Sequence, residues 1–234
     1  MNPKIKLFES FEALNSCVIK CRLCPRLVDY REHVLPKPKF QHEIYWRKPI
    51  PGFGDPKAWL LLTGLAPSPD GGNRTGRIFT GDATGRFLMK MLYQAGFANQ
   101  PICESAKDGL ILKDCYLTAA VKCVPPLHKP TPQECRNCAQ YYHNEVYLLK
   151  NLKAVLALGR LAFDAYLQYA KMQGFSTRNM PFRHGAKYQW GDRVPALYAS
   201  YHPSPQNTNT GKLSEEMLLT LLEQIRAQSS LPAN

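Results

Sequence analysis

Four short apolar runs recur along the chain, and each is followed by a turn signal. Each run is too short for a typical helix and is apolar on both faces, which is the pattern of strands buried inside a parallel sheet. The strands predicted in this way cover residues 58–64, 114–121, 154–159 and 195–200.

Amphipathic segments separate these runs. Residues 84–96 carry one apolar stripe at helical spacing, and Gly96 is suited to end that helix. A second helix is predicted at residues 131–150, where Thr131 fits an N-cap and Glu134 completes a capping box. Two more helical patterns lie at residues 160–171 and 212–228.

Strands that alternate with helices of these lengths predict an α/β fold, a three-layer sandwich formed by a single domain that spans residues 1–234. Residues 28–57 lack such a pattern, and their prolines and lysines indicate an excursion over the surface. Chemically distinctive segments follow each predicted strand. Because an open parallel sheet binds its ligands at the carboxyl ends of its strands, we expect one functional cleft at that edge.

The charge balance points to a polyanionic partner. The chain has 30 Lys and Arg against 18 Asp and Glu, a formal net charge of +12. Such an excess favours nucleic acid, although a basic protein without a nucleic-acid role has the same balance. The N-terminal residues resemble no secretory signal, and no apolar run reaches the roughly 18 residues of a membrane span. We therefore expect a cytoplasmic monomer that binds no membrane.

Eight cysteines in a reducing compartment are better explained as metal ligands or buried thiols than as disulfides. Cys21 and Cys24 form a CxxC pair, and Cys123 and Cys138 bracket a proline-rich segment. Four thiolates gathered in this way hold zinc or an iron–sulfur cluster. An alternative set joins the CxxC pair to Cys135 and Cys138, which share one helical face and would suit tetrahedral zinc. Spacing alone does not separate the two sets.

Several longer motifs are highly specific when they occur in this order. They are YWRKPIPGFGD at residues 45–55, GLAP at 64–67, NRTGRIFTGD at 73–82, VKCVPP at 121–126 and YHPSP at 201–205. Together they resemble family five of the uracil-DNA glycosylase superfamily over nearly the whole chain. The resemblance implies a central parallel four-stranded sheet flanked by helices. It also implies a [4Fe–4S] cluster whose ligands, carried over by position, are Cys21, Cys24, Cys123 and Cys138.

The activity implied by the resemblance is hydrolysis of the N-glycosidic bond of a base flipped out of DNA. The partner is then DNA that contains uracil or another deaminated base, and the product is an abasic site in base excision repair. No lysine is singled out as a nucleophile, so the enzyme is expected to be monofunctional and to leave the strand intact. The polar loop at residues 204–212 is implied to enter the minor groove and fill the gap left by the flipped nucleotide.

Two residues are candidates for the chemistry. Asp82 would position the attacking water and stabilise charge on the sugar, and its place just before a helix favours a negative charge there. The same place makes it an ordinary N-cap, a role that does not exclude catalysis. His202 follows the fourth predicted strand, where a donor would stabilise negative charge on the base carbonyl.

Four further residues are assigned to substrate binding. Phe79 is a candidate to stack on the extruded base, although it fits a core aromatic equally well. Ala66 belongs to the GLAP motif that the resemblance places beside the base. Asn73 and Arg77 are expected to contact base or backbone, or else to tie their own loop together.

Substrate range follows from missing polar groups. Leu65 stands where many relatives place a residue that positions water, and Ala119 and Ala120 stand where the neighbouring cluster-bearing family carries an Asn. A pocket without such partners discriminates less sharply, so hypoxanthine and other deaminated bases are expected beside uracil. Two alternatives stay open: a zinc-bearing module that binds damaged DNA without catalysis, and a uracil-only glycosylase of the neighbouring cluster-bearing family.

Overall fold

The computed structural model describes residues 6–191 and 194–229. The four predicted strands pair in parallel in the order β3-β2-β4-β6 and form the centre of one sheet. The prediction of a parallel four-stranded centre is therefore confirmed. The observed strands are β2 (Leu60–Gly64), β3 (Cys115–Ala119), β4 (Ala154–Leu158) and β6 (Ala196–Ser200).

The sheet as a whole has six strands and is mixed, because two short antiparallel strands that were not predicted flank the parallel centre. A two-residue strand β1 (Phe53–Gly54) pairs antiparallel with β3, and β5 (Lys187–Tyr188) pairs antiparallel with β6. A two-residue strand carries no measurable periodicity, and the pairing partner of β1 lies far away in sequence. These edge strands were for that reason missed.

The four long predicted helices are confirmed with small shifts at their ends. They are α4 (Ala83–Gln94), α5 (Pro132–Leu148), α6 (Arg160–Met172) and α8 (Glu215–Ser229). Not predicted were α1 (Phe11–Ile19), α2 (Pro25–His33), the one-turn helices α3 (Gly72–Thr75) and α7 (Pro205–Thr208), and the 3₁₀ turns η1 (Pro38–Phe40) and η2 (Pro126–His128).

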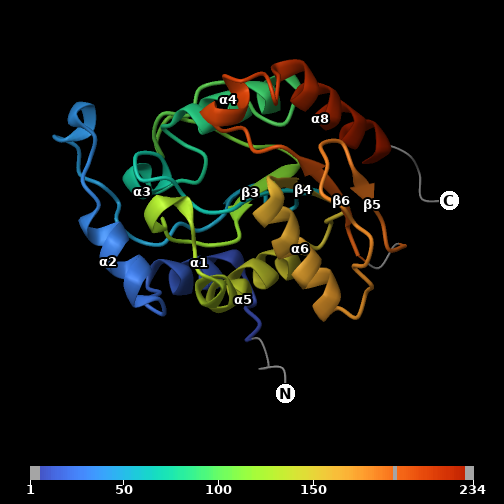
Figure 1. Cartoon of the computed structure of the whole chain (residues 1–234), viewed down its shortest axis with the longest axis horizontal. Helices are drawn as coiled ribbons and strands as arrows, with labels where there is room; N and C mark the ends of the chain where they lie inside the picture. Colours follow the sequence, from blue (N-terminus) through green and yellow to red (C-terminus); the bar gives the residue numbers. More distant parts are fainter. Residues whose placement is uncertain (1–5, 192–193, 230–234) are drawn as a thin grey trace.

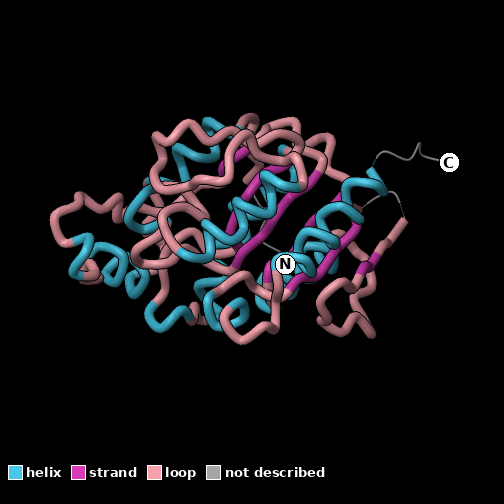
Figure 2. Tube along the Cα trace, turned by 90° about the horizontal axis from the view of Figure 1, so that it is seen from above, coloured by secondary structure: helices cyan, strands magenta, loops and turns pink. Residues whose placement is uncertain are grey.

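The segment at residues 28–57 is only partly the surface excursion that was predicted. Most of α2 and all of β1 fall within it. A nine-residue helix such as α2 is marginal in isolation, and burial of Leu27 and Val28 stabilises it. The part that does project, residues 34–44, extends from the body beyond α2 in Figure 1 and in Figure 2.

Helices cover both faces of the sheet, so the three-layer prediction is confirmed (Figure 1). Helices α4 and α8 pack on one face, and α1, α5 and α6 lie on the other. Alternate residues of β2 serve the two layers: Leu60 and Leu62 join the cluster with α4 and α8, whereas Leu61 packs with Tyr142 and Phe163. Among the described helices, none is long and apolar enough to cross a membrane.

A buried ion pair joins the end of β3 to α5. Lys122 Nζ donates to Glu145 Oε2 at 2.7 Å and to Thr118 Oγ1 at 2.5 Å, and the Thr118 hydroxyl donates to Glu145 Oε2 at 2.6 Å. The Lys122 and Glu145 side chains are 1% and 0% exposed. An ion in such a place is tolerated because both charges and their hydrogen-bonding groups have partners.

We predict that Glu145→Gln lowers the free energy of unfolding by about 3 to 5 kcal/mol, because it leaves the Lys122 ammonium buried without its counter-charge. Urea unfolding followed by far-UV circular dichroism measures the change. Asp164→Asn, in the exposed pair Arg160–Asp164, is the matched control and is expected to cost less than about 1 kcal/mol. A Glu145→Gln protein as stable as the control would contradict the role given to this pair.

Candidate active site and cysteine hollow

The segments that follow the parallel strands meet at the carboxyl edge of the sheet, as the sequence predicted. The amide of Ala120, after β3, donates to the carbonyl of Gly64 at the end of β2 at 2.9 Å. The amide of Gly159, after β4, donates to the carbonyl of Ser200 at 2.8 Å. Neighbouring strand ends are thus tied in pairs, and the residues beyond them are held in fixed relation.

Asp82 is the N-cap of α4 and is half-buried. Its Oδ1 accepts from the amide of Gly85 at 2.8 Å, and its Oδ2 accepts from the hydroxyl of Ser68. The Ser68 oxygen in turn accepts from the amide of Gly71 at 3.0 Å, and any side chain at Gly71 would collide with both groups. The carboxylate therefore caps α4, is held in one orientation by two hydrogen bonds and is only partly exposed to solvent.

His202 follows β6 and is half-buried. Burial lowers the pKa of its imidazole, the charge of Asp82 acts in the opposite direction, and His128 lowers it further. The Asn207 amide donates to the His202 carbonyl at 2.8 Å. A Cβ at Gly159, where φ is +97°, would lie 3.2 Å from the His202 Cβ. The charge of Asp82 thus acts on His202, but burial has the larger effect on its pKa and favours the neutral imidazole.

Phe79 lies in the core, with 8% of the residue exposed. Its ring packs against the backbone of Gly64, where a Cβ would come within 2.7 Å of Phe79 Cζ. The backbone of Phe79 has φ +50°, a left-handed value that is costly for a residue with a side chain. The core interpretation describes its observed contacts, and stacking on a base stays a prediction.

Asn73 and Arg77 both find partners within the protein. The Asn73 side chain donates to the Arg31 carbonyl at 3.1 Å. The Arg77 guanidinium pairs with Asp108 at 2.7 Å and lies over the ring of Phe53. These contacts are the ones expected if both residues hold their own loop together. Only 6% of Arg77 is exposed, and its assignment to substrate binding stays a prediction.

Ala66 is half-buried and packs beside the cluster of apolar residues that surrounds the cysteines. No contact of Ala66 with a base is tested, so its assignment stays a prediction. Ser68 was missed by sequence reasoning. Its position in the same loop as GLAP, within a segment rich in turn residues, was the available signal, but its contact with Asp82 depends on the folded loop.

Four cysteines line one hollow between α2, α5 and the segment after β3. Its cysteines are Cys21, Cys24, Cys123 and Cys138, whereas Cys135 does not line it. This is the set that the resemblance implied, and the geometry brings its members together.

Nitrogen donors point at the sulfur atoms of this set. Arg31 Nη1 donates to Cys123 Sγ at 3.2 Å, and the Lys122 amide donates to Cys138 Sγ at 3.2 Å. Arg31 Nε is also buried, and it has no hydrogen-bond partner within the described part of the chain. Donors of this kind stabilise negative charge on sulfur, so the residues fit an anionic cluster bound by thiolates.

Burial favours the protonated thiol at two of these cysteines, Cys123 and Cys138. Burial raises the pKa of Cys123 to about 11 and raises the pKa of Cys138 above its usual range. Across residues 6–191 and 194–229, no group of three or more His, Cys, Asp or Glu side chains is arranged to hold a single metal ion.

Comparison with known proteins identifies the family of this chain. The family model described as the uracil DNA glycosylase superfamily matches residues 51–226. A type-5 uracil-DNA glycosylase of Thermus thermophilus is 48% identical over 94% of this chain and 99% of its own length. A type-5 uracil-DNA glycosylase of Pyrobaculum aerophilum is 43% identical over 91% and 90%.

A more distant relative is a type-4 uracil-DNA glycosylase of Archaeoglobus fulgidus, 28% identical over 66% of this chain and 70% of its own length. The chain belongs to the uracil-DNA glycosylase superfamily and, within it, to the type-5 family.

Proposed function

We propose that this chain is a monofunctional DNA glycosylase that removes uracil, and also hypoxanthine and other deaminated bases, from DNA. The proposal is supported by Asp82, whose carboxylate is oriented by Gly85 and Ser68, and by His202 after β6, whose imidazole pKa is raised by the charge of Asp82 against the larger effect of burial. The names of the type-5 relatives support uracil as a substrate. The net charge of +12 supports DNA as the partner.

In the proposed reaction a flipped nucleotide enters the cleft between the strand ends. The bond between the sugar C1′ and the base nitrogen breaks, and its electron pair leaves on the base. A neutral His202 donates a hydrogen bond to the base carbonyl that gains this charge. The Asp82 carboxylate stabilises the oxocarbenium-like sugar, orients the water that adds to C1′ and accepts its proton. Each Asp82 oxygen has a further lone pair beyond its bond to Gly85 or Ser68.

Breadth of substrate is supported by the apolar character of the strand ends. Ala119 and Ala120 are buried at the end of β3, and Leu65 follows β2. None of the three side chains offers a hydrogen bond to the edge of a base. Strong discrimination between bases arises when the wrong base leaves a buried polar group of the site without a partner. A site without such groups rejects other bases only weakly.

The monofunctional proposal is supported by the state of Lys122, the lysine nearest to these strand ends in sequence. Its ammonium is 1% exposed and bound to Glu145 and Thr118. A Schiff-base nucleophile needs a free amine that reaches the sugar. Lys122 is not available for that role.

We further propose that Cys21, Cys24, Cys123 and Cys138 hold a [4Fe–4S] cluster. The shared hollow and the donors from Arg31 and Lys122 support this set. Hydrolysis of a glycosidic bond needs no electron transfer, so the role we propose for the cluster is structural. When bound, it would cross-link the N-terminal helices to α5.

We predict that Asp82→Asn lowers the single-turnover rate on uracil-containing DNA by about 100-fold to 10,000-fold. Asn caps a helix as well as Asp does, so the stability of the variant should lie within about 1 kcal/mol of the wild type. DNA affinity, measured by fluorescence anisotropy, should change little. Asp82→Ser serves as a second cap-preserving control, and full activity in either variant would reduce Asp82 to a cap.

We predict that duplexes with a single uracil or a single hypoxanthine both yield abasic sites. Cleavage should appear on a denaturing gel only after treatment with alkali, because the enzyme leaves the strand intact. An otherwise identical duplex without the modified base is the control. Cleavage of uracil DNA alone would favour the uracil-only alternative, and cleavage without alkali would contradict the monofunctional proposal.

We predict that purified protein is brown, with a broad absorption band near roughly 400 nm from charge transfer between thiolate and iron. Cys123→Ser should lose the band and the bound iron, measured by elemental analysis. The matched variant Cys135→Ser should keep both, since Cys135 does not line the hollow. Colourless protein that contains zinc and has no glycosylase activity would instead support the zinc-bearing binding module.

A further inference from the structure

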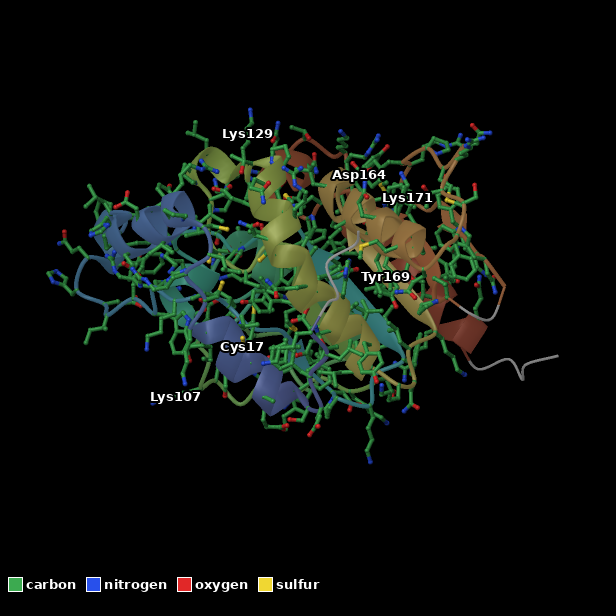
Figure 3. The ribbon with its side chains drawn as sticks, turned by 90° about the horizontal axis from the view of Figure 1, so that it is seen from below. Cys17, Lys107, Lys129, Asp164, Tyr169 and Lys171 are labelled. Atoms are coloured by element: carbon green, nitrogen blue, oxygen red, sulfur yellow. The ribbon has the colours of Figure 1, made fainter. Side chains whose placement is uncertain are left out.

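The segment that projects from the body, residues 34–44, is attached to the loop between β2 and α4. Lys37 Nζ pairs with the carboxylate of Asp70 in that loop at 3.1 Å. Tyr45, which follows the segment, donates its hydroxyl to the same carboxylate at 2.9 Å. In Figure 3 the segment lies at the end of the molecule away from Lys171. The projection therefore has a fixed attachment on one loop of the candidate active site.

Arg74 is a second attachment point between the same two parts of the chain. Its guanidinium carbon lies 4.0 Å from the centre of the Phe40 ring, and its Nη1 donates to Glu43 Oε2 at 2.7 Å. Only 8% of the Arg74 side chain is exposed. Because the guanidinium is planar and rigid, a ring on one face and a carboxylate at one edge fix its orientation.

The remaining donors of Arg74 point into the loop. Arg74 Nε donates to the carbonyl of Asp70 at 2.7 Å, and Nη2 donates to the carbonyl of Gly81 at 3.0 Å. Gly81 has φ +79°, and a Cβ at this position would collide with Arg74 Nη2. One guanidinium thus joins the first arm of the loop to the second, and the backbone at Gly81 leaves room for it.

The two carbonyls bound by Arg74 lie next to the residues that orient the candidate catalytic carboxylate. Asp70 follows Ser68 by two positions, and Gly81 directly precedes Asp82. The Ser68 hydroxyl donates to Asp82 Oδ2 across the same two arms. By fixing the separation of the arms, the guanidinium keeps the Ser68 hydroxyl within hydrogen-bonding reach of the carboxylate.

A contact with a DNA phosphate is the other role that an arginine in this loop could have. The geometry disfavours it. Each of the three nitrogen atoms of the Arg74 guanidinium already donates to an acceptor within the protein. Phe40 covers one face of the group. Arg74 would have to give up contacts with its own loop to reach a phosphate.

We propose that Arg74 is a positioning residue for base excision. Its guanidinium, held in place from residues 34–44, joins the two arms of the loop and keeps Asp82 bonded to Ser68 in the orientation that the reaction uses. The proposal gives the projecting segment a function, which is to hold Arg74 from outside. It rests on the proposed glycosylase function, because that function assigns the chemistry to Asp82.

The first experiment compares Arg74→Lys with wild type on duplex DNA that contains uracil. Lysine keeps the charge, but its ammonium lacks the planar fork that binds two carbonyls at a fixed separation. We expect the single-turnover rate to fall about 10-fold to 100-fold, as for a displacement of about 1 Å at a catalytic group. DNA affinity and its salt dependence should not change. A salt slope reduced by about one would identify a phosphate contact and overturn the proposal.

Glu43→Gln tests the same arrangement from the surface and leaves the buried contacts of Arg74 in place. Its matched control is Glu104→Gln, since the Glu43 and Glu104 side chains are both 46% exposed and each pairs with an arginine. We expect the rate of Glu43→Gln to fall about twofold to fivefold, in line with the loss of an exposed ion pair. Glu104→Gln should keep the wild-type rate. Equal rates in these two variants would overturn the proposal.

A double-mutant cycle separates positioning of Asp82 from general support of the fold. In the Asp82→Asn background, Arg74→Lys should cause no further loss of rate, because the group that Arg74 positions is already absent. A residue that only stabilises the fold would lower the rate by the same factor in both backgrounds. That result would overturn the proposal.

Failure of the proposed function is distinguishable from failure of this inference. If wild type releases no base from uracil-containing DNA, the glycosylase function fails. The orienting contacts are then measured by hydrogen exchange at the amides of Gly71 and Gly85, which donate to Ser68 Oγ and Asp82 Oδ1. Arg74→Lys should speed exchange at both amides about 10-fold, while the amides of β4 exchange as in wild type. Unchanged exchange at Gly71 and Gly85 would contradict the role given to Arg74.

Discussion

The buried pair of Lys122 and Glu145 is the interaction on which the arrangement of this protein depends most. It joins the end of a central strand to a long helix with no solvent between them. Removing either charge would leave the other unpaired in the protein interior, where an isolated ion is unstable. The end of β3 and α5 therefore keep one relative position. Lys122 directly precedes one cysteine of the hollow, and its amide donates to another, Cys138. The pair therefore holds the sheet, α5 and the hollow in one frame.

From that frame the chemistry extends to the carboxyl edge of the sheet. The loops after β2 and β3 are joined by backbone hydrogen bonds, and those after β4 and β6 are joined in the same way. Asp82 combines a structural contact with the catalytic role that we propose for it. Its contact with Gly85 starts α4, and its second oxygen is oriented by Ser68.

The loop that runs from the hollow to α5 connects the two functional regions. Its first residues are anchored at Cys123, and its last are held by Arg26, whose guanidinium also pairs with Glu134. Between these anchors the chain makes two consecutive left-handed turns near His202. A cluster bound by the four thiols would stiffen one end of this loop.

The sequence by itself determined the parallel strands, the four long helices and the cap at Asp82, because each depends on local periodicity or on a contact a few residues away. It also predicted the four cysteines that share the hollow, through motifs rather than through spacing. Only the tertiary structure decided what depends on residues distant in sequence. The pairing of β1 with β3, the partners of Asn73 and Arg77 and the contact of Ser68 with Asp82 arise from long-range packing, which no local pattern of hydrophobic and polar residues encodes.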